Sequence, residues 1–304
     1  SEKRKGMNTE DICNICGSKR FELVKSKLRD DKTKFKVFRC TDCRHVQLLP
    51  RPTEDEDKEF YNKNLQDKNR DKEIDYETLR INNLFDTKRH VRLIQMLCTN
   101  LDSRILDIGS GYGFFVNELY NSGYKNVTGI EISCERRAMA LKHSHVQIID
   151  FDVNNPERNI GKFDFITLFH VLEHMADPVD FLKKIKSLLN TAGILICEVP
   201  NVREMLLDNC KEYNDFYWIR AHLNYFSDVT LLDCIKKAGY RDIEIRFEQR
   251  YGLVNLCNWL IAGKPQIEKP VFEIIDAYKP VESFYRKHLE STGKSDAIIA
   301  IVRI

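Results

Sequence analysis

The stretch Arg104–Phe115 constrains the fold of this chain more than any other. Its apolar run Ile105–Ile108 is typical of a short buried strand. Glycines then stand at three alternate positions, Gly109, Gly111 and Gly113, and an apolar pattern with helical spacing begins after them. A strand, a tight glycine turn and a helix start, in this order, let the backbone approach a ligand closely. The sequence therefore predicts an α/β fold with a ligand at this turn.

The turn favours a ligand with an amino-acid end over a dinucleotide. Counted from Gly109, the third glycine of the dinucleotide pattern G-x-G-x-x-G is replaced by Phe114. Asp107 would also bring a carboxylate close to a pyrophosphate, and like charges at short range repel. An ammonium group can meet Asp107 instead, while a carboxylate meets the turn amides. S-adenosylmethionine has such an end, so the turn indicates this cofactor.

Two later strands carry residues that suit the rest of this cofactor. A second strand ends in Glu131, about twenty residues past the glycines, where a carboxylate can accept hydrogen bonds from both ribose hydroxyls. A third strand is expected over residues 145–153. Asp152 near its end can accept a hydrogen bond from the adenine amino group, and Val153 can pack on the ring.

Four motifs together resemble the class I S-adenosylmethionine-dependent methyltransferases. "D-I-G-S-G-Y-G", "G-I-E", "F-H-V-L-E-H-M-A-D-P" and "E-V-P-N" occur in that family's order between residues 90 and 201. The resemblance implies a doubly wound, mostly parallel seven-stranded α/β sheet and methyl transfer from S-adenosyl-L-methionine. The cofactor-binding residues it implies are Asp107, Gly109, Ser110, Gly111, Gly113, Glu131, Ile132, Asp152, Val153 and Phe169. The alternative is a glycine turn in an unrelated α/β protein.

Four cysteines near the start of the chain have metal-ligand spacing. Cys13 and Cys16 form one C-x-x-C pair, and Cys40 and Cys43 form another about two dozen residues later. Two such pairs predict a tetrahedral structural Zn²⁺ site, and no secretion signal supports disulfides instead. Alternating apolar residues between the pairs predict short strands, hence a zinc ribbon over residues 1–50. Metal binding would supply much of the folding energy of so small a segment.

Length and composition set the domain organisation. The 304 residues suggest about two domains. We expect the zinc ribbon at 1–50, a polar linker at 51–75 and a methyltransferase domain at 76–304. A net charge of +2 gives no strong field to select nucleic acid or an anionic membrane. No apolar run is long enough to cross a bilayer, and the charged start does not read as a signal peptide, which favours a cytoplasmic protein.

The ribbon, the following "L-L-P-R-P-T-E-D-E" and the catalytic motifs narrow the resemblance. Together they are similar to zinc-ribbon methyltransferases of sugar and polysaccharide biosynthesis, the deoxysugar C-methyltransferases among them. The similarity extends to "A-H-L-N-Y-F-S" at 221–227. It implies a nucleotide-linked or glycan sugar as the methyl acceptor.

Residues 201–228 are interpreted as an acceptor lid, because aromatic, basic and imidazole groups mixed in one segment suit a pocket better than a packed core. The predicted substrate residues are Asn201, Tyr217, Trp218, Arg220 and Tyr225. Residues 251–290 are expected to be a helical insertion that serves as a cap or a homodimer contact.

His222 is the first candidate for a general base, since its neutral imidazole is available near pH 7. In the sugar C-methyltransferases a glutamate precedes this histidine and a tyrosine stands two residues further back. Here Ala221 and Ile219 occupy those positions, which favours O-methylation over C-methylation. His170 ends the fourth strand and is expected to contact or orient the reactants. A purely structural histidine is the alternative for both.

Two other functions remain open. Zinc-ribbon RNA methyltransferases also combine these modules, but the sequence from Phe169 to Leu172 lacks the N/D-P-P-Y-like turn of the common base-amine enzymes. A steep salt dependence of RNA binding would favour that function. A non-catalytic adenosylmethionine-binding regulator is the second alternative.

Overall fold

The computed structural model describes residues 11–29, 34–62, 75–154, 158–265 and 276–304. Its larger sheet has the strand order β10-β11-β8-β7-β4-β5-β6. The strands are β4 (Ile105–Ile108), β5 (Val127–Ile130), β6 (Gln147–Ile149), β7 (Phe163–Phe169), β8 (Leu189–Pro200), β10 (Asp242–Glu248) and β11 (Ala297–Arg303). The strands from β8 to β6 pair in parallel, and β11 pairs antiparallel with both β8 and β10. This sheet confirms the predicted fold class.

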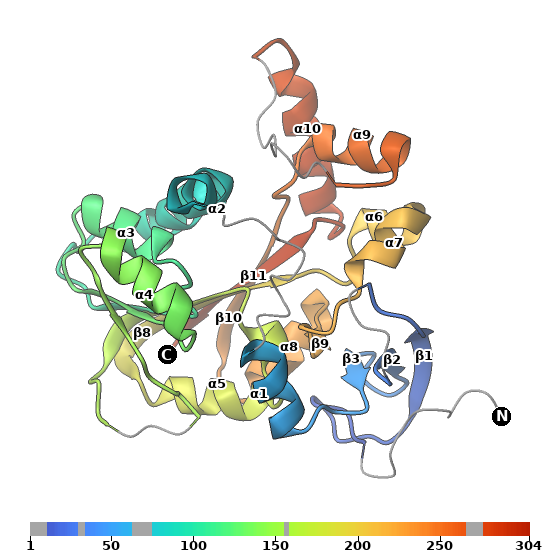
Figure 1. Cartoon of the computed structure of the whole chain (residues 1–304), viewed down its shortest axis with the longest axis horizontal. Helices are drawn as coiled ribbons and strands as arrows, with labels where there is room; N and C mark the ends of the chain where they lie inside the picture. The colour runs from blue at the N-terminus through green and yellow to red at the C-terminus, as the bar shows by residue number, and fades with distance from the viewer. Residues whose placement is uncertain (1–10, 30–33, 63–74, 155–157, 266–275) are drawn as a thin grey trace.

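Helices cover both faces of the large sheet (Figure 1). One face packs against α2 (Tyr76–Leu97), α3 (Phe114–Asn121) and α4 (Cys134–His143), the other against α5 (Pro178–Lys186) and α8 (Asp228–Lys237). Side chains alternate along β4, so that Ile105 packs in the core beneath α2, α3 and α4, and Leu106 packs in the core beneath α5 and α8. Burial on both faces explains why these strands read as continuous apolar runs in the sequence.

A smaller sheet contains the predicted ribbon. It consists of β1 (Phe21–Lys25), β2 (Lys36–Cys40), β3 (Val46–Leu49) and β9 (Asn224–Tyr225), all paired antiparallel. In the β3–β9 pair, Val46 lies opposite Tyr225 and Gln47 lies opposite Asn224. Strand β9 comes from the predicted lid, so this sheet joins residues from both sides of the predicted domain boundary.

The remaining elements lie around the two sheets. They are α1 (Glu54–Asn62), η2 (Leu172–His174), α6 (Met205–Asn209), α7 (Lys211–Tyr217), α9 (Leu253–Ala262), η3 (Asp276–Tyr278) and α10 (Lys279–Ser291). Residues 63–74 of the predicted linker and 266–275 of the predicted insertion lie outside the described residues. Among the helices that are described, none combines the length and the apolar character needed to cross a membrane.

Candidate active site

The carboxyl ends of four parallel strands bring the predicted cofactor residues to one edge of the large sheet. Strand β4 lies between β5 and β7, and β6 follows β5. The glycine turn after β4, Glu131 after β5 and Asp152 after β6 therefore meet at the same edge. Open α/β sheets bind their ligands at this edge.

Glycine is needed at the three positions of the turn for different structural reasons. All adopt left-handed backbone angles, with φ of 78° at Gly109, 55° at Gly111 and 77° at Gly113. An added Cβ would lie 2.6 Å from Val171 at Gly109 and 2.7 Å from Ile148 at Gly113. At Gly111 a Cβ would meet no described heavy atom within 4 Å. Packing thus fixes the outer glycines, while the middle one faces open space where a ligand can approach.

Two buried carboxylates flank the turn. Asp107 is 4% exposed and accepts a 2.6 Å hydrogen bond from the Thr167 hydroxyl. Burial raises the pKa of Asp107 to about 7, so a cationic partner would stabilise its ionised form. The Glu131 carboxylate accepts from the backbone N–H groups of Gly111, at 2.8 Å, and Ser133, at 2.7 Å. Glu131 therefore bridges the turn and the start of α4.

The other predicted cofactor residues lie along the same edge. Ile132 is 65% exposed, an apolar side chain left open to solvent beside Glu131. Asp152 is exposed and accepts from the Asn154 amide, whereas Val153 is buried. The buried Ser110 hydroxyl has no hydrogen-bond partner among the described residues. Phe169 stacks on the imidazole of His90, with ring centroids 3.6 Å apart.

His170 lies directly after β7, between two buried carboxylates. It has a φ of 57°, which is uncommon for a residue other than glycine. Its Nδ1 lies 3.4 Å from Glu173 and its Nε2 lies 3.2 Å from Glu198. Burial alone would lower its pKa, but these carboxylates outweigh burial and raise the pKa of His170 to about 9. His170 is therefore charged at neutral pH, which suits an orienting role better than proton abstraction.

A buried ion network behind His170 was missed by the sequence reasoning. Glu198 of β8 is fully buried and binds both guanidinium nitrogens of Arg89, at 2.7 and 2.8 Å, and Nε2 of His90, at 3.0 Å. Arg250 extends the network to Asp86. A glutamate inside the apolar run I-L-I-C-E-V was the available signal, because a charge in a buried strand needs partners. The network ties α2 to the strand edge that presents His170.

A second cluster, on the predicted acceptor side, joins η2 to the predicted lid. Glu173, His174 and His222 each place a ligand-type atom within 4.8 Å of the others. Nδ1 of His174 donates to the carbonyl of Ala221 at 2.8 Å, and its ring lies 5.1 Å from that of His222. Burial, then the electrostatic effect of the neighbouring His174, lower the pKa of His222 to about 3. His222 is thus neutral near pH 7, as expected, but it is a weaker base than an ordinary histidine.

The predicted acceptor pocket needs a correction, because three of its residues form a packed core. Trp218 is 3% exposed, Tyr225 is 2% exposed, and their rings lie 4.8 Å apart in a T-shaped contact. Arg220 is 3% exposed and forms a 2.6 Å ion pair with Asp57 of α1. The cause is the β3–β9 pairing, which turns this part of the lid against the ribbon core. Trp218 and Tyr225 pack the lid against the ribbon core, and Arg220 pairs the lid with α1.

Asn201 and Tyr217, the other two predicted substrate residues, differ from each other. Asn201 is fully buried; its amide donates to the carbonyls of Gly293 and Ser295, and its oxygen accepts from the Arg203 amide. This side chain is committed to the backbone, so the prediction that it faces substrate is wrong. Tyr217 is half-buried, and its hydroxyl has no hydrogen-bond partner among the described residues. It remains a candidate acceptor contact.

The four N-terminal cysteines come together as the spacing predicts. Sγ of Cys13 lies 3.4 Å from that of Cys43, and Sγ of Cys16 lies 3.6 Å from that of Cys40. A tetrahedral Zn²⁺ with Zn–S bonds of about 2.3 Å requires separations of about 3.8 Å, so the four sulfurs fit such an ion. Asn224 of β9 connects this knuckle to the acceptor side. It accepts from the Asn14 side chain at 2.8 Å and donates to the carbonyl of Met175, next to η2, at 2.7 Å.

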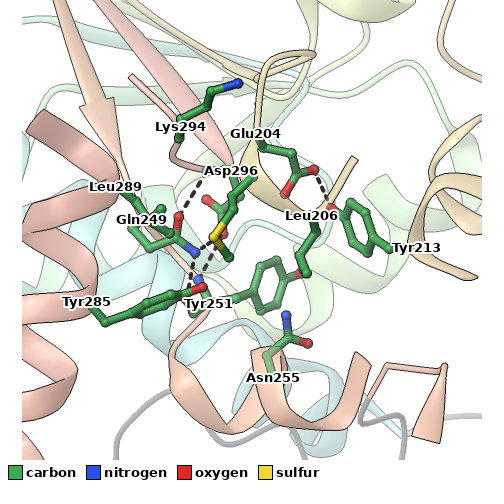
Figure 2. A pocket seen from close by; sticks show the side chains of 11 residues that line it. Glu204, Leu206, Tyr213, Gln249, Tyr251, Asn255, Tyr285, Leu289, Lys294 and Asp296 are labelled. Carbon is green, nitrogen blue, oxygen red and sulfur yellow. Dashed lines mark hydrogen bonds between the residues drawn. The ribbon is translucent and has the colours of Figure 1, made fainter. Parts of the chain in front are cut away.

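A further polar pocket lies beyond the end of β8, between α6, α7 and α10 (Figure 2). Its two acids are Glu204, which accepts from the Tyr213 hydroxyl, and Asp296, which accepts from the Gln249 amide at 3.1 Å. Burial, then the charge of Asp296, raise the pKa of Glu204 well above its usual range. Since the Glu204 carboxylate is hydrogen-bonded to Tyr213 and Asp296 to Gln249, we interpret this pocket as a structural junction of the C-terminal helices with the sheet.

The fold and the cofactor edge define an S-adenosylmethionine-dependent methyltransferase. A family model described as a methyltransferase domain matches residues 68–245, more than half of the chain. The chain therefore belongs to this methyltransferase domain family.

Curated relatives and solved structures agree with this family. The ubiquinone biosynthesis O-methyltransferase of Actinobacillus pleuropneumoniae is 29% identical over 162 residues, which cover 45% of this chain and 68% of that protein. The protein of the same name from Haemophilus ducreyi is 27% identical with the same coverage. Magnesium protoporphyrin IX methyltransferase from Synechocystis PCC 6803 shares the fold, with a TM-score of 0.50 and 16% identity over 81% of this chain and 96% of that chain. These matches do not confirm the narrower resemblance to sugar methyltransferases.

Proposed function

We propose that this enzyme transfers a methyl group from S-adenosylmethionine to a hydroxyl oxygen of a small molecule. The observation that carries the proposal is the contact between the two halves of the site. Val171, at the start of the acceptor-side segment, packs so closely on Gly109 of the cofactor turn that a Cβ there would lie 2.6 Å away. Glu173 and His174 follow two and three residues later. An acceptor beside them is therefore next to the cofactor.

The cofactor half supplies binding and orientation. The Asp107 carboxylate can hold the cofactor ammonium, the open face of Gly111 can admit its carboxylate, and Glu131 can accept the ribose hydroxyls. Ile132 and Val153 are proposed to pack on the adenine, and Asp152 is proposed to accept a hydrogen bond from its amino group. Transfer would then be an in-line displacement: the acceptor hydroxyl would give its proton to His222 or to solvent, its oxygen would bond to the methyl carbon, and the electron pair of the breaking C–S bond would stay on sulfur. Most of the acceleration comes from positioning the oxygen within about 3–3.5 Å of that carbon.

Oxygen is favoured over carbon as the methylated atom. The positions that would help a sugar carbanion hold Ala221 and Ile219, neither of which carries a titratable group. The curated relatives are named as O-methyltransferases. Because these relatives align with less than half of this chain, the acceptor is proposed only by class: a phenol or catechol, as the first candidate, or a nucleotide-linked sugar, which the ribbon resemblance favours.

The ribbon is proposed to be structural. Four thiolates at the observed spacing suit Zn²⁺, and the bound ion would hold the knuckle that Asn14 connects to Asn224. Strand β3 and Asn224 would in turn fix the lid segment that carries His222. The ribbon then acts on catalysis through the position of the lid.

The proposal is tested by incubating the protein with methyl-labelled adenosylmethionine and a panel of catechols, nucleotide sugars and ribosomal RNA. We expect label as a methoxy group on a small-molecule acceptor, and at least a tenfold loss of kcat in His222→Ala with unchanged cofactor affinity. Label on RNA or on carbon would overturn the proposal. Tight cofactor binding without transfer to any acceptor would favour the non-catalytic regulator.

A further inference from the structure

We propose that Glu173, His174 and His222 bind a first-row divalent cation on the acceptor side of the enzyme, at a site distinct from the four cysteines of the ribbon. The three ligand atoms lie within 4.8 Å of one another. Two imidazoles and one carboxylate that leave coordination positions open are a ligand set typical of catalytic first-row metals. Each of the three residues has a nitrogen or oxygen atom whose lone pair could bind a metal ion.

Glu173 provides the negative charge for the site. Its side chain is only 1% exposed, and neither carboxylate oxygen has a hydrogen-bond partner among the described residues. The nearest cationic group is Nδ1 of His170, at 3.4 Å. The charged His170 offsets part of the cost of burying this carboxylate, and a bound cation would offset more of it.

His174 has its tautomer fixed for metal binding. Its Nδ1 lies 2.8 Å from the carbonyl oxygen of Ala221. Because a carbonyl can only accept, Nδ1 carries a proton, and in the neutral imidazole Nε2 then keeps a lone pair. Nε2 lies 4.0 Å from the Glu173 carboxylate, on the side of the cluster. Metal-binding histidines commonly donate their other N–H to a backbone carbonyl in this way.

His222 completes the set from the lid. Its Nδ1 is buried and has no hydrogen-bond partner within the part of the chain that the structure describes. Its ring lies 5.1 Å from that of His174, at an angle of 70°. Metal–ligand bonds of about 2.1 Å place neighbouring ligand atoms about 3.0–3.5 Å apart, so the three side chains need to close by roughly 1 Å on binding. Side-chain rotation can supply that movement, and the imidazole content favours Zn²⁺, Fe²⁺ or Co²⁺ over Mg²⁺.

The open positions of such an ion define the acceptor more narrowly, and this step rests on the proposed oxygen methylation. Two neighbouring oxygens, as in a catechol or a vicinal diol, can occupy two adjacent positions. The cation would lower the pKa of the hydroxyl to be methylated, whose proton leaves to solvent before transfer. The oxygen then forms the C–O bond, and sulfur keeps the electron pair of the broken C–S bond. This arrangement does not need His222 as a proton acceptor.

The test uses Co²⁺ added to the 304-residue chain after its ribbon has been loaded with Zn²⁺. We expect one Co²⁺ to bind per chain, with the weak visible bands of nitrogen and oxygen ligands and without the intense thiolate bands that Co²⁺ in the ribbon would give. Glu173→Gln and His222→Ala should each weaken this binding at least tenfold. His145→Ala, which removes an exposed histidine outside the cluster, is the matched control and should bind Co²⁺ as the unchanged protein does.

Affinity for S-adenosylmethionine, measured on every variant, shows that the cofactor half is still folded. The metal site is overturned if no Co²⁺ binds beyond the ribbon, or if both cluster variants bind it normally. Addition of a catechol should shift the Co²⁺ bands, and an unchanged spectrum overturns the acceptor part of the inference. Co²⁺ binding that the variants weaken, with no methylation of any oxygen acceptor, would uphold the metal site and overturn the proposed function.

Discussion

The proposed cofactor half and the proposed acceptor half of the site are built in different ways. The cofactor half comes from one stretch of about fifty residues, in which each strand end contributes its own group to the sheet edge. The acceptor half combines η2, the lid and strand β3 of the ribbon, which lie far apart in the sequence. The first is fixed by local turn chemistry, and the second depends on long-range pairing between segments.

The two halves also differ in how their polar groups are satisfied. Glu131 and Asp107 both accept hydrogen bonds from neighbouring residues, and only the Ser110 hydroxyl among the predicted cofactor residues is a buried polar atom without a partner in the described part of the chain. Glu173, Tyr217 and His222 contain buried polar atoms with no hydrogen-bond partner among the described residues. Each such atom costs about 1–3 kcal/mol, so the acceptor half gives up stability for groups that a ligand can use. This difference between the two halves is tested by variants that change the properties of one half and leave those of the other half unchanged.

The largest expected effect is loss of the ribbon ion. Cys40→Ser should abolish zinc binding and lower methyl transfer at least a hundredfold, because the lid loses its support on β3. Adenosylmethionine affinity, measured by calorimetry, should change less than threefold. Cys257→Ser, at an exposed cysteine, is the control. A parallel loss of cofactor affinity would show that the two halves do not fold independently.

The second largest effect is expected from breaking the buried ion pair between the lid and α1. Arg220→Met leaves the Asp57 carboxylate without its partner and should lower the free energy of unfolding by about 3 kcal/mol. Arg203→Met removes an exposed ion pair with Asp228 and should cost less than about 1 kcal/mol. Chemical denaturation measures both. Equal costs would contradict the burial of Arg220 in a packed core.

Within the cofactor half, Asp107→Asn should weaken adenosylmethionine binding about 10- to 100-fold, since a hydrogen bond to a charged group contributes about 1.5–3 kcal/mol. Co²⁺ binding at the acceptor cluster should be unchanged. Asp180→Asn, on the outer surface of α5, serves as the control. Normal cofactor affinity in Asp107→Asn would remove the basis for assigning the ammonium to this carboxylate.

The raised pKa of Asp107 also predicts a pH dependence. Below the value of about 7, the empty protein holds a proton on Asp107 that must leave before the cofactor ammonium binds. The dissociation constant should therefore rise up to tenfold per pH unit as the pH falls below 7, and Asp107→Asn should flatten the profile. With the pKa raised above the unfolded value of about 3.9, this group lowers the stability of the empty protein as pH rises from about 4 to 7. Calorimetry and thermal unfolding across this range measure the two effects.

The smallest expected effect is that of Tyr217→Phe. Removing a buried hydroxyl without a partner should leave the free energy of unfolding unchanged or raise it by about 1 kcal/mol. If this hydroxyl contacts the acceptor, KM for the acceptor rises severalfold while cofactor affinity stays constant. Marked destabilisation would show that the hydroxyl has a structural partner.

The sequence by itself determined the large sheet, the edge that carries the predicted cofactor residues, and the cysteine cluster. Each depends on short spacing: alternate glycines after a strand, an acid at each strand end, and paired cysteines around a tight turn. Backbone geometry forces such residues together wherever the element forms, so no knowledge of the rest of the fold was needed.

Only the tertiary structure decided the acceptor half. Trp218, Arg220 and Tyr225 have the composition of a binding pocket, but the pairing of β9 with β3 turns them into a core. The neighbourhood of Glu173 and His222 likewise depends on contacts between residues about fifty positions apart. Side-chain type alone cannot distinguish a pocket from a core, because the difference lies in which distant segment covers the residues.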